Sequence, residues 1–136
     1  MNSLDIEREI VEKYVKKNKQ ERILWELTNV KKRDGVIWKF AGTAIFKDSC
    51  LQKIEYMSGS LLVKYLYELG SSKSIYYIGE SYIGEMNLEE AVKKANNGEI
   101  CIIYCGNGIG YYQGEQEYGS PPRYILKISK EEIGYM

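Results

Sequence analysis

A run of fifteen residues in the second half of the chain, Glu99 to Gln113, constrains the fold more than any other part of the sequence. It reads EICIIYCGNGIGYYQ. Its first seven residues are mostly apolar, which is typical of a strand that is covered on both faces. Asn107 and Gly108 follow, and an Asn-Gly pair readily takes the positive φ angles that a tight hairpin requires. We therefore expect a buried strand, a hairpin turn and a second strand.

Capping residues and apolar spacing divide the rest of the chain. Asn87 lies three residues before Glu90, which is typical of a helix N-terminus, and Asn97-Gly98 is typical of a helix end. Apolar residues at every third or fourth position predict two helices, or one bent helix, within residues 4–31. The other expected elements are a helix over 50–57 capped by Asp48 or Ser49, a helix over 61–69 ended by Gly70, and strands over 74–79 and 123–129. The segment 36–46 fits either a strand or a short buried helix.

This order of elements predicts an α+β fold in a single domain spanning residues 1–136. The half at 1–70 is expected to be mainly helical, and the half at 71–136 to run strand–helix–strand–strand–strand. We expect the N-terminal helices to pack on a small mixed sheet. Its two central strands would run parallel through a right-handed crossover.

The residue types that are missing limit the chemistry. The chain has no histidine, which removes the usual general base near neutral pH and the usual zinc ligand. Cys101 and Cys105 would lie about 13 Å apart on one strand, too far for a disulfide. With Cys50 they are expected to be buried thiols in a cytoplasmic protein that holds no metal. No apolar run reaches the length of a membrane span, and the N-terminus does not resemble a signal peptide.

Charged and aromatic residues offer possible binding surfaces. The net charge is zero, but residues 13–33 carry eight Lys or Arg against two Glu. That run forms either a phosphate-facing surface or a solvated helix face. Zero net charge argues against a protein dedicated to specific nucleic-acid binding. Thirteen tyrosines favour a binding surface for a ligand, a protein partner or a second copy, so we expect a homo-oligomer.

The segment 106–124 carries the candidate site. Its sequence GNGIG leads into a strand and lacks the Lys-Ser/Thr ending, which excludes a dinucleotide-binding turn and a P-loop. Pro121-Pro122 stiffens the entry to the last strand. Tyr111 and Tyr112 offer stacking faces, and Arg123 offers an anion clamp. The two glutamates of the loop either take part in the site or keep the loop soluble. The expected ligand-binding residues are Asn107, Tyr111, Tyr112, Glu115, Glu117 and Arg123.

The stretch GEQEYGSPPRYILKI resembles the last motif of ADP-ribosyltransferases of the ExE type. In that family a Glu-x-Glu turn is followed, four residues after the second glutamate, by proline and a terminal strand. Glu115, Glu117 and Pro121 match this spacing. The resemblance implies NAD as cofactor, with Glu117 polarising its ribose and Glu115 orienting the nucleophile. It covers about fifteen residues, and the early arginine strand and the Ser-Thr-Ser motif of that family have no good match here.

The leading hypothesis is a non-catalytic binding protein without a cofactor. It would sequester a nucleotide-like signal or ligand at residues 106–124, in a bacterium or phage, with a role in defence or anti-defence. One alternative is the ADP-ribosyltransferase-like enzyme using Glu115 and Glu117. Two others are a histidine-free ribonuclease whose basic helix holds RNA, and an immunity or inhibitor protein that binds a partner through a tyrosine-rich surface.

Overall fold

The computed structural model describes residues 3–116 and 119–128 of the chain. The helices are α1 (Ser3–Tyr14), α2 (Lys17–Thr28), α3 (Gly59–Glu68) and α4 (Leu88–Asn96), with the 3₁₀ helices η1 (Arg33–Phe40) and η2 (Asp48–Cys50). The strands are β1 (Leu51–Ile54), β2 (Ser74–Gly79), β3 (Ile83–Asn87), β4 (Cys101–Gly106), β5 (Ile109–Gln113) and β6 (Arg123–Lys127). The fold is α+β, and helices precede the strands at the N-terminal end, as the sequence predicts.

The strands form one sheet in the order β1-β6-β5-β4-β2-β3. Every pairing between these described strands is antiparallel, so the expectation of a mixed sheet with parallel central strands is wrong. The cause is β3, a strand that the sequence analysis does not predict. Because β3 reverses the chain between β2 and α4, the chain leaves α4 in the direction that places β4 antiparallel to β2.

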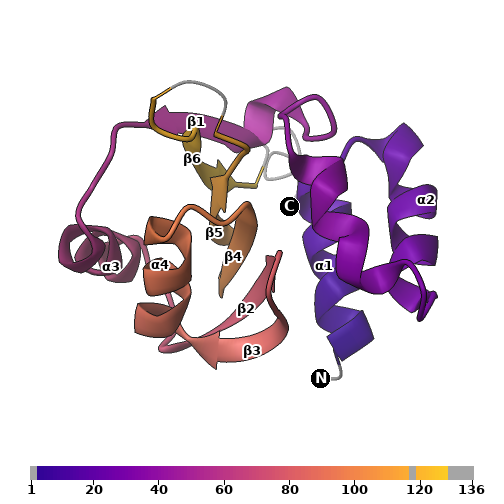
Figure 1. Cartoon of the computed structure of the whole chain (residues 1–136), viewed down its shortest axis with the longest axis horizontal. Coiled ribbons are helices and arrows are strands. Elements are labelled where there is room, and N and C mark those ends of the chain that lie inside the picture. The colour runs from indigo at the N-terminus through magenta and orange to yellow at the C-terminus, as the bar shows by residue number, and fades with distance from the viewer. Residues whose placement is uncertain (1–2, 117–118, 129–136) are drawn as a thin grey trace.

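Helices cover both faces of the sheet (Figure 1), with α1, α2 and η1 on one side and α3 and α4 on the other. Successive strand residues point to opposite faces, so each strand contributes to both cores. In β2, Tyr76 and Ile78 pack against the first group of helices, and Ile75 and Tyr77 against the second. This explains why β2 and β4 read as nearly continuous apolar runs.

Two local predictions are confirmed at atomic detail. The Asn87 side chain accepts a hydrogen bond from the Glu90 backbone N–H at 2.8 Å and caps α4. The β4–β5 connection is a tight hairpin in which Gly106, Asn107 and Gly108 all have positive φ, at 87°, 55° and 74°. The glycines of GNG are therefore explained by turn geometry.

The region from residue 33 to residue 58 differs from expectation. The ambiguous apolar segment is mainly the 3₁₀ helix η1, in which Val36, Ile37 and Phe40 are buried. The helix expected over residues 50–57 is absent from the structure. The short helix η2 precedes β1 there, and β1 pairs with β6 at the edge of the sheet. That pairing comes from β6, about seventy residues further along the chain, so no local spacing signals it.

A buried ion pair fastens the N-terminal helices to the sheet. Arg33 at the start of η1 contacts Glu7 of α1, whose side chain is completely buried. The Tyr76 hydroxyl of β2 donates to the same carboxylate. Burial and the Glu7 hydrogen bond both raise the pKa of Tyr76, and Glu7 raises the pKa of Arg33. The Glu7 carboxylate thus joins α1, η1 and β2.

All three cysteines are buried as reduced thiols, as expected. Burial raises the pKa of Cys105 to about 11 and that of Cys101 to about 12. No helix within the described ranges has the length and apolar composition needed to cross a bilayer.

Candidate functional site

Arg123 is the first residue of β6 and lies between Ile54 of β1 and Gln113 of β5 in the strand register. Its side chain is buried, with 8% of the residue exposed. The guanidinium Nη1 donates to the Pro121 carbonyl at 3.1 Å, and Cζ lies 4.9 Å from the centre of the Tyr56 ring. Among the residues that the structure describes, no carboxylate pairs with it. It is a buried cation that lacks a counter-charge in the described part of the chain.

A neutral hydrogen-bonded network starts on β5, where Gln113 is aligned with Arg123. The Tyr111 hydroxyl donates to Gln113 Oε1 at 2.8 Å, and Gln113 Nε2 donates to the carbonyls of Ala95 and Glu99 at 2.6 and 2.9 Å. Burial raises the pKa of Tyr111, with a smaller opposing contribution from Arg123. The phenol therefore stays protonated at neutral pH and offers no charge to neutralise the guanidinium.

Arg123 lines a pocket of about 270 Å³. We call it the Arg123 pocket; its lining residues are Lys53, Ile54, Glu55, Tyr56, Ser120, Pro121, Pro122 and Arg123. The charged lining residues are two cations, Lys53 and Arg123, and one carboxylate, Glu55. Tyr56 is 59% exposed, so its ring presents apolar surface to solvent at the pocket while Arg123 lies over it. The two prolines form a stiff wall because their rings fix φ.

The structure separates the residues that the sequence analysis grouped into one site. Asn107 lies at the β4–β5 turn, and its side chain donates to the Gly70 carbonyl at 3.3 Å. Arg123 pairs with Gln113 at the other end of β5. Five strand residues span roughly 17 Å, so the hairpin tip and the guanidinium lie at opposite ends of the sheet.

The tyrosine pair is not placed for stacking on a ligand. Tyr111 and Tyr112 are both 0% exposed and point to opposite faces of the sheet. Tyr112 packs instead against Phe46 with the rings tilted and their centres 4.6 Å apart, and its hydroxyl donates to the Phe40 carbonyl. As placed, neither ring is able to take the stacking role expected of it, because strand alternation turns one ring into each core.

The structure describes only one of the two glutamates of the loop. Glu115 is exposed, its backbone N–H donates to the Ala41 carbonyl at 3.0 Å, and it does not line the Arg123 pocket. Glu117 lies outside the described residues. The ADP-ribosyltransferase resemblance, which needs both carboxylates, therefore stays a prediction from sequence.

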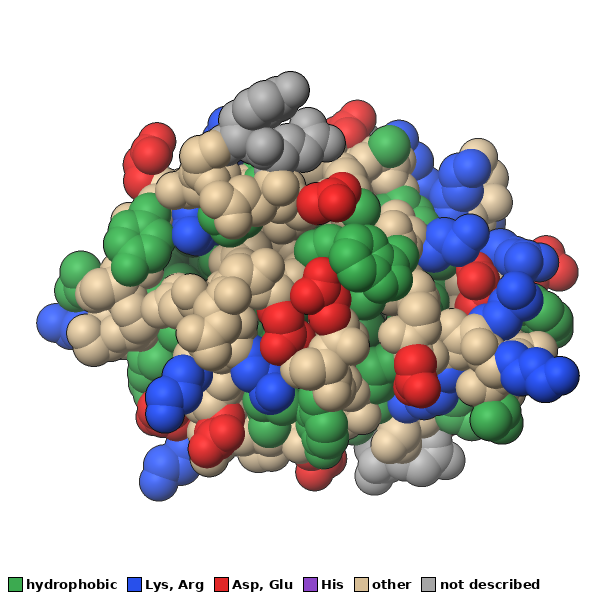
Figure 2. All heavy atoms as spheres, in the orientation of Figure 1, with side chains coloured by type: hydrophobic (Ala, Val, Ile, Leu, Met, Phe, Trp, Pro, Cys, Tyr) green, Lys and Arg blue, Asp and Glu red, His purple; other side chains and the backbone are tan. Residues whose placement is uncertain are grey.

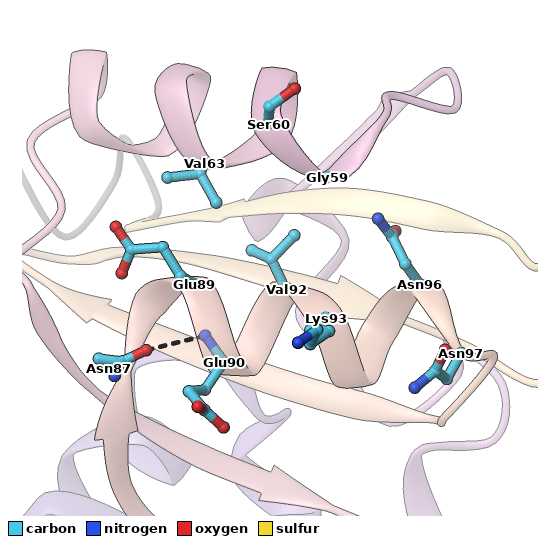
Figure 3. A pocket seen from close by; sticks show the side chains of 10 residues that line it. All are labelled: Gly59, Ser60, Val63, Asn87, Glu89, Glu90, Val92, Lys93, Asn96 and Asn97. Carbon is cyan, nitrogen blue, oxygen red and sulfur yellow. Dashed lines mark hydrogen bonds between the residues drawn. The ribbon is translucent and has the colours of Figure 1, made fainter.

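A larger groove of about 620 Å³ lies between α3 and α4 (Figure 3). Val63 and Val92 face each other across it, and the Asn96 amide points toward Gly59. Its polar groups include two that already have partners: Asn87 caps α4, and Glu89 accepts from the Tyr67 hydroxyl at 3.1 Å. None of the charged residues that line it is buried. The groove is roomier than the Arg123 pocket but presents no unsatisfied buried charge, so we place the candidate site at Arg123.

Lys53 and Tyr56 are functional candidates that sequence reasoning missed. Both lie in the segment expected to be a helix, and only the pairing of β1 with β6 brings them beside Arg123. In the described ranges no group of His, Cys, Asp or Glu side chains is placed to hold a metal ion. Comparisons with protein-family models, curated proteins and solved structures find no match to this chain.

Proposed function

We propose that the protein binds a small anionic, nucleotide-like ligand in the Arg123 pocket and holds it without chemical change. The observation that carries this proposal is the buried Arg123 guanidinium, which has no carboxylate partner among the described residues. Leaving a charge in a dehydrated site is costly unless an opposite charge joins it. A ligand phosphate supplies that charge, and the planar guanidinium fork suits two phosphate oxygens at once.

The neighbours of Arg123 define the ligand further. Lys53 is exposed at the same pocket and adds a second positive charge. The exposed Tyr56 ring supplies a stacking surface for a planar base. A volume of about 270 Å³ is just below the range of about 300–1,000 Å³ typical of ligand pockets. This supports a mononucleotide, or one nucleotide unit of a larger signal, as the bound group.

The biological version of this proposal is sequestration of a nucleotide signal in a bacterium or phage. Binding without turnover needs no general base near neutral pH, and the chain has no histidine to supply one. We further propose that the protein is a homo-oligomer, on the strength of the exposed apolar residues Leu61 and Tyr82, which lie outside the Arg123 pocket. Native mass spectrometry measures the oligomeric state as well as ligand binding.

Isothermal titration and native mass spectrometry with AMP, ADP, ATP, adenosine and inorganic phosphate test the proposal. We expect the nucleotides to bind and adenosine to bind far more weakly. Arg123→Gln should weaken nucleotide binding by about 30-fold or more, the effect of losing about 2 kcal/mol at a desolvated charge pair. Lys127→Gln is the matched control, because Lys127 is an exposed cation on the same strand. Equal affinity for AMP and adenosine, or an equal loss in both variants, contradicts the proposal.

A second set of variants separates the ligand contacts from an effect on folding. Lys53→Gln alters an exposed side chain and should lower affinity and its salt dependence while thermal unfolding is unchanged. Tyr56→Ala should weaken binding by about fivefold or more through lost stacking, and Tyr56→Phe should restore it. If Tyr56→Ala leaves affinity unchanged, the base does not stack there.

Incubation with NAD and with RNA addresses the catalytic alternatives. We expect both to be recovered intact after prolonged incubation with the protein. Consumption of NAD that stops in Glu115→Gln would instead establish the enzyme implied by the ExE-like motif. Cleavage of RNA would establish the ribonuclease.

A further inference from the structure

Positive charge is concentrated in one part of the fold. Residues 16–40, which comprise α2, η1, the loop between them and the residue before α2, contain eight Lys or Arg and three Asp or Glu, a net charge of +5. The remainder of the chain is therefore −5, because the whole is neutral. In Figure 2 the blue side chains gather on the right, over α2, at the end of the molecule away from β1 and β6. The zero net charge of the chain is therefore the sum of a positive segment and a negative remainder.

Six of the eight cations of this part are exposed, whereas one of its three acidic side chains, Glu26, is buried. Arg22 Nε and Lys39 Nζ lie 3.6 and 3.9 Å from the same oxygen of Glu26. The Glu26 side chain is only 8% exposed, against 61% for Arg22 and 49% for Lys39. The carboxylate thus sits beneath the two cations and holds them side by side. The exposed cations of the α2–η1 surface are Lys17, Lys19, Arg22, Lys31, Lys32 and Lys39.

Both tryptophans of the chain lie exposed among these cations. Trp25 in α2 is 45% exposed and Trp38 in η1 is 55% exposed. The Arg22 guanidinium lies 4.8 Å from the centre of the Trp25 ring. The buried faces of α2 and η1 are formed by other residues, such as Ile23 and Phe40. The two tryptophans are therefore not core residues. Large aromatic rings next to clustered cations are what stacked bases and a phosphate backbone require.

We propose that the α2–η1 surface binds single-stranded nucleic acid without sequence preference. Its cations neutralise successive phosphates, and Trp25 and Trp38 stack on unpaired bases. Base stacking on a side chain needs an open base face, which a duplex does not offer. An anionic membrane would also attract the cations, but α2 packs its apolar residues Ile23 and Leu27 into the core and keeps no continuous apolar face for lipid.

Fluorescence anisotropy with a labelled 20-nucleotide oligo(U) tests the proposal, together with quenching of the intrinsic tryptophan emission. Because the two tryptophans are the only ones in the chain, quenching reports this surface directly. Affinity should fall with salt with a log–log slope of about −0.7 per phosphate contacted. Four contacts then correspond to a loss of about 50-fold between 50 and 200 mM salt.

Matched double variants assign the effect to the surface. Lys31→Gln with Lys32→Gln should weaken oligo(U) binding and reduce the size of the slope by about 1.4. Lys64→Gln with Lys93→Gln makes the same charge change at exposed sites on α3 and α4 and should leave the slope unchanged. Trp38→Ala should weaken binding by about fivefold or more, Trp38→Phe should retain most of it, and Tyr82→Ala should have no effect.

Three results would overturn the proposal. The first is an equal loss of affinity in the two lysine pairs. The second is tighter binding of a duplex than of oligo(U). The third is quenching by phosphatidylglycerol vesicles without quenching by oligo(U), which would identify a lipid surface instead. Arg123→Gln should leave oligo(U) binding intact, so this surface and the Arg123 pocket succeed or fail separately.

Discussion

The Arg33 guanidinium donates to both oxygens of the Glu7 carboxylate, from Nη1 to Oε1 at 2.7 Å and from Nη2 to Oε2 at 2.5 Å. Nη1 also donates to the Leu27 carbonyl at the end of α2, at 3.0 Å. The ion pair therefore joins α1, α2 and η1, and the Tyr76 hydroxyl extends it to the sheet. Because Glu7 is completely buried, removing its charge leaves Arg33 without its counter-charge.

Glu7→Gln should lower the free energy of unfolding by about 3 kcal/mol, the lower end of the range for a broken buried pair, because Arg33 keeps partial contact with water. Urea unfolding followed by circular dichroism measures the change. Glu12→Gln, an exposed glutamate on the same helix, should change it by less than about 0.5 kcal/mol. Equal effects in the two variants would show that the ion pair contributes nothing.

Alkaline pH should unfold the protein through its buried phenols and thiols. Burial raises the pKa of Tyr76 and of five further tyrosines above the ordinary 10.0, namely Tyr14, Tyr77, Tyr104, Tyr111 and Tyr112. Above about pH 9 the unfolded chain loses protons that the folded chain retains, first from cysteine and then from tyrosine, so stability falls as pH rises. Tyrosinate absorbance should rise together with the loss of circular dichroism between pH 9 and 12. Tyrosine ionisation that is complete while the fold remains intact would refute this.

Gly110→Ala should destabilise the sheet. A Cβ at Gly110 would lie 2.8 Å from the Ile103 carbonyl oxygen, which is part of the neighbouring strand and has little freedom to move. Overpacking of this kind costs about 1–3 kcal/mol. Gly35→Ala is the control, since a Cβ there meets nothing within 4 Å. A shift in the thermal midpoint that is the same for both variants would contradict the steric argument.

Substitutions at Asn107 test the division of the sequence-predicted site. Its φ of 55° is strained for most side chains, so Asn107→Val should cost about 1–3 kcal/mol and Asn107→Gly much less. Neither should change nucleotide affinity, because the turn lies at the opposite end of β5 from Arg123. Loss of nucleotide binding in the stable Asn107→Gly variant would place the ligand at the hairpin after all.

Sequence patterns succeeded where neighbours along the chain decide the structure. The cap of α4 needs only Asn87 and the Glu90 backbone, and the hairpin needs only the φ preferences of Asn107 and its flanking glycines. The burial of Arg123 shows the limit of such reasoning. Its stiff approach through Pro121-Pro122 is visible in the sequence, but the partners that shape its pocket lie almost seventy residues earlier.

The two strands that the sequence analysis missed, β1 and β3, are both at the edges of the sheet. Each pairs with one strand only, and β3 contains Gly84 and Glu85, which weaken a strand signal. Their conformation is imposed by a neighbour that supplies hydrogen bonds. Missing β3 also produced the error in strand direction, because a single overlooked reversal inverts the direction of β4 relative to β2.

The pairing of β1 with β6 has a consequence for synthesis. Leu51 is aligned with Leu126, so β1 leaves the ribosome without its partner strand, which is made only about seventy residues later. At about 5–20 residues per second, that wait lasts on the order of ten seconds. The Arg123 pocket is assembled from these same two strands and the segments beside them. It therefore forms only after β6 has been made, and a chain that terminates before residue 123 has β1 but no pocket.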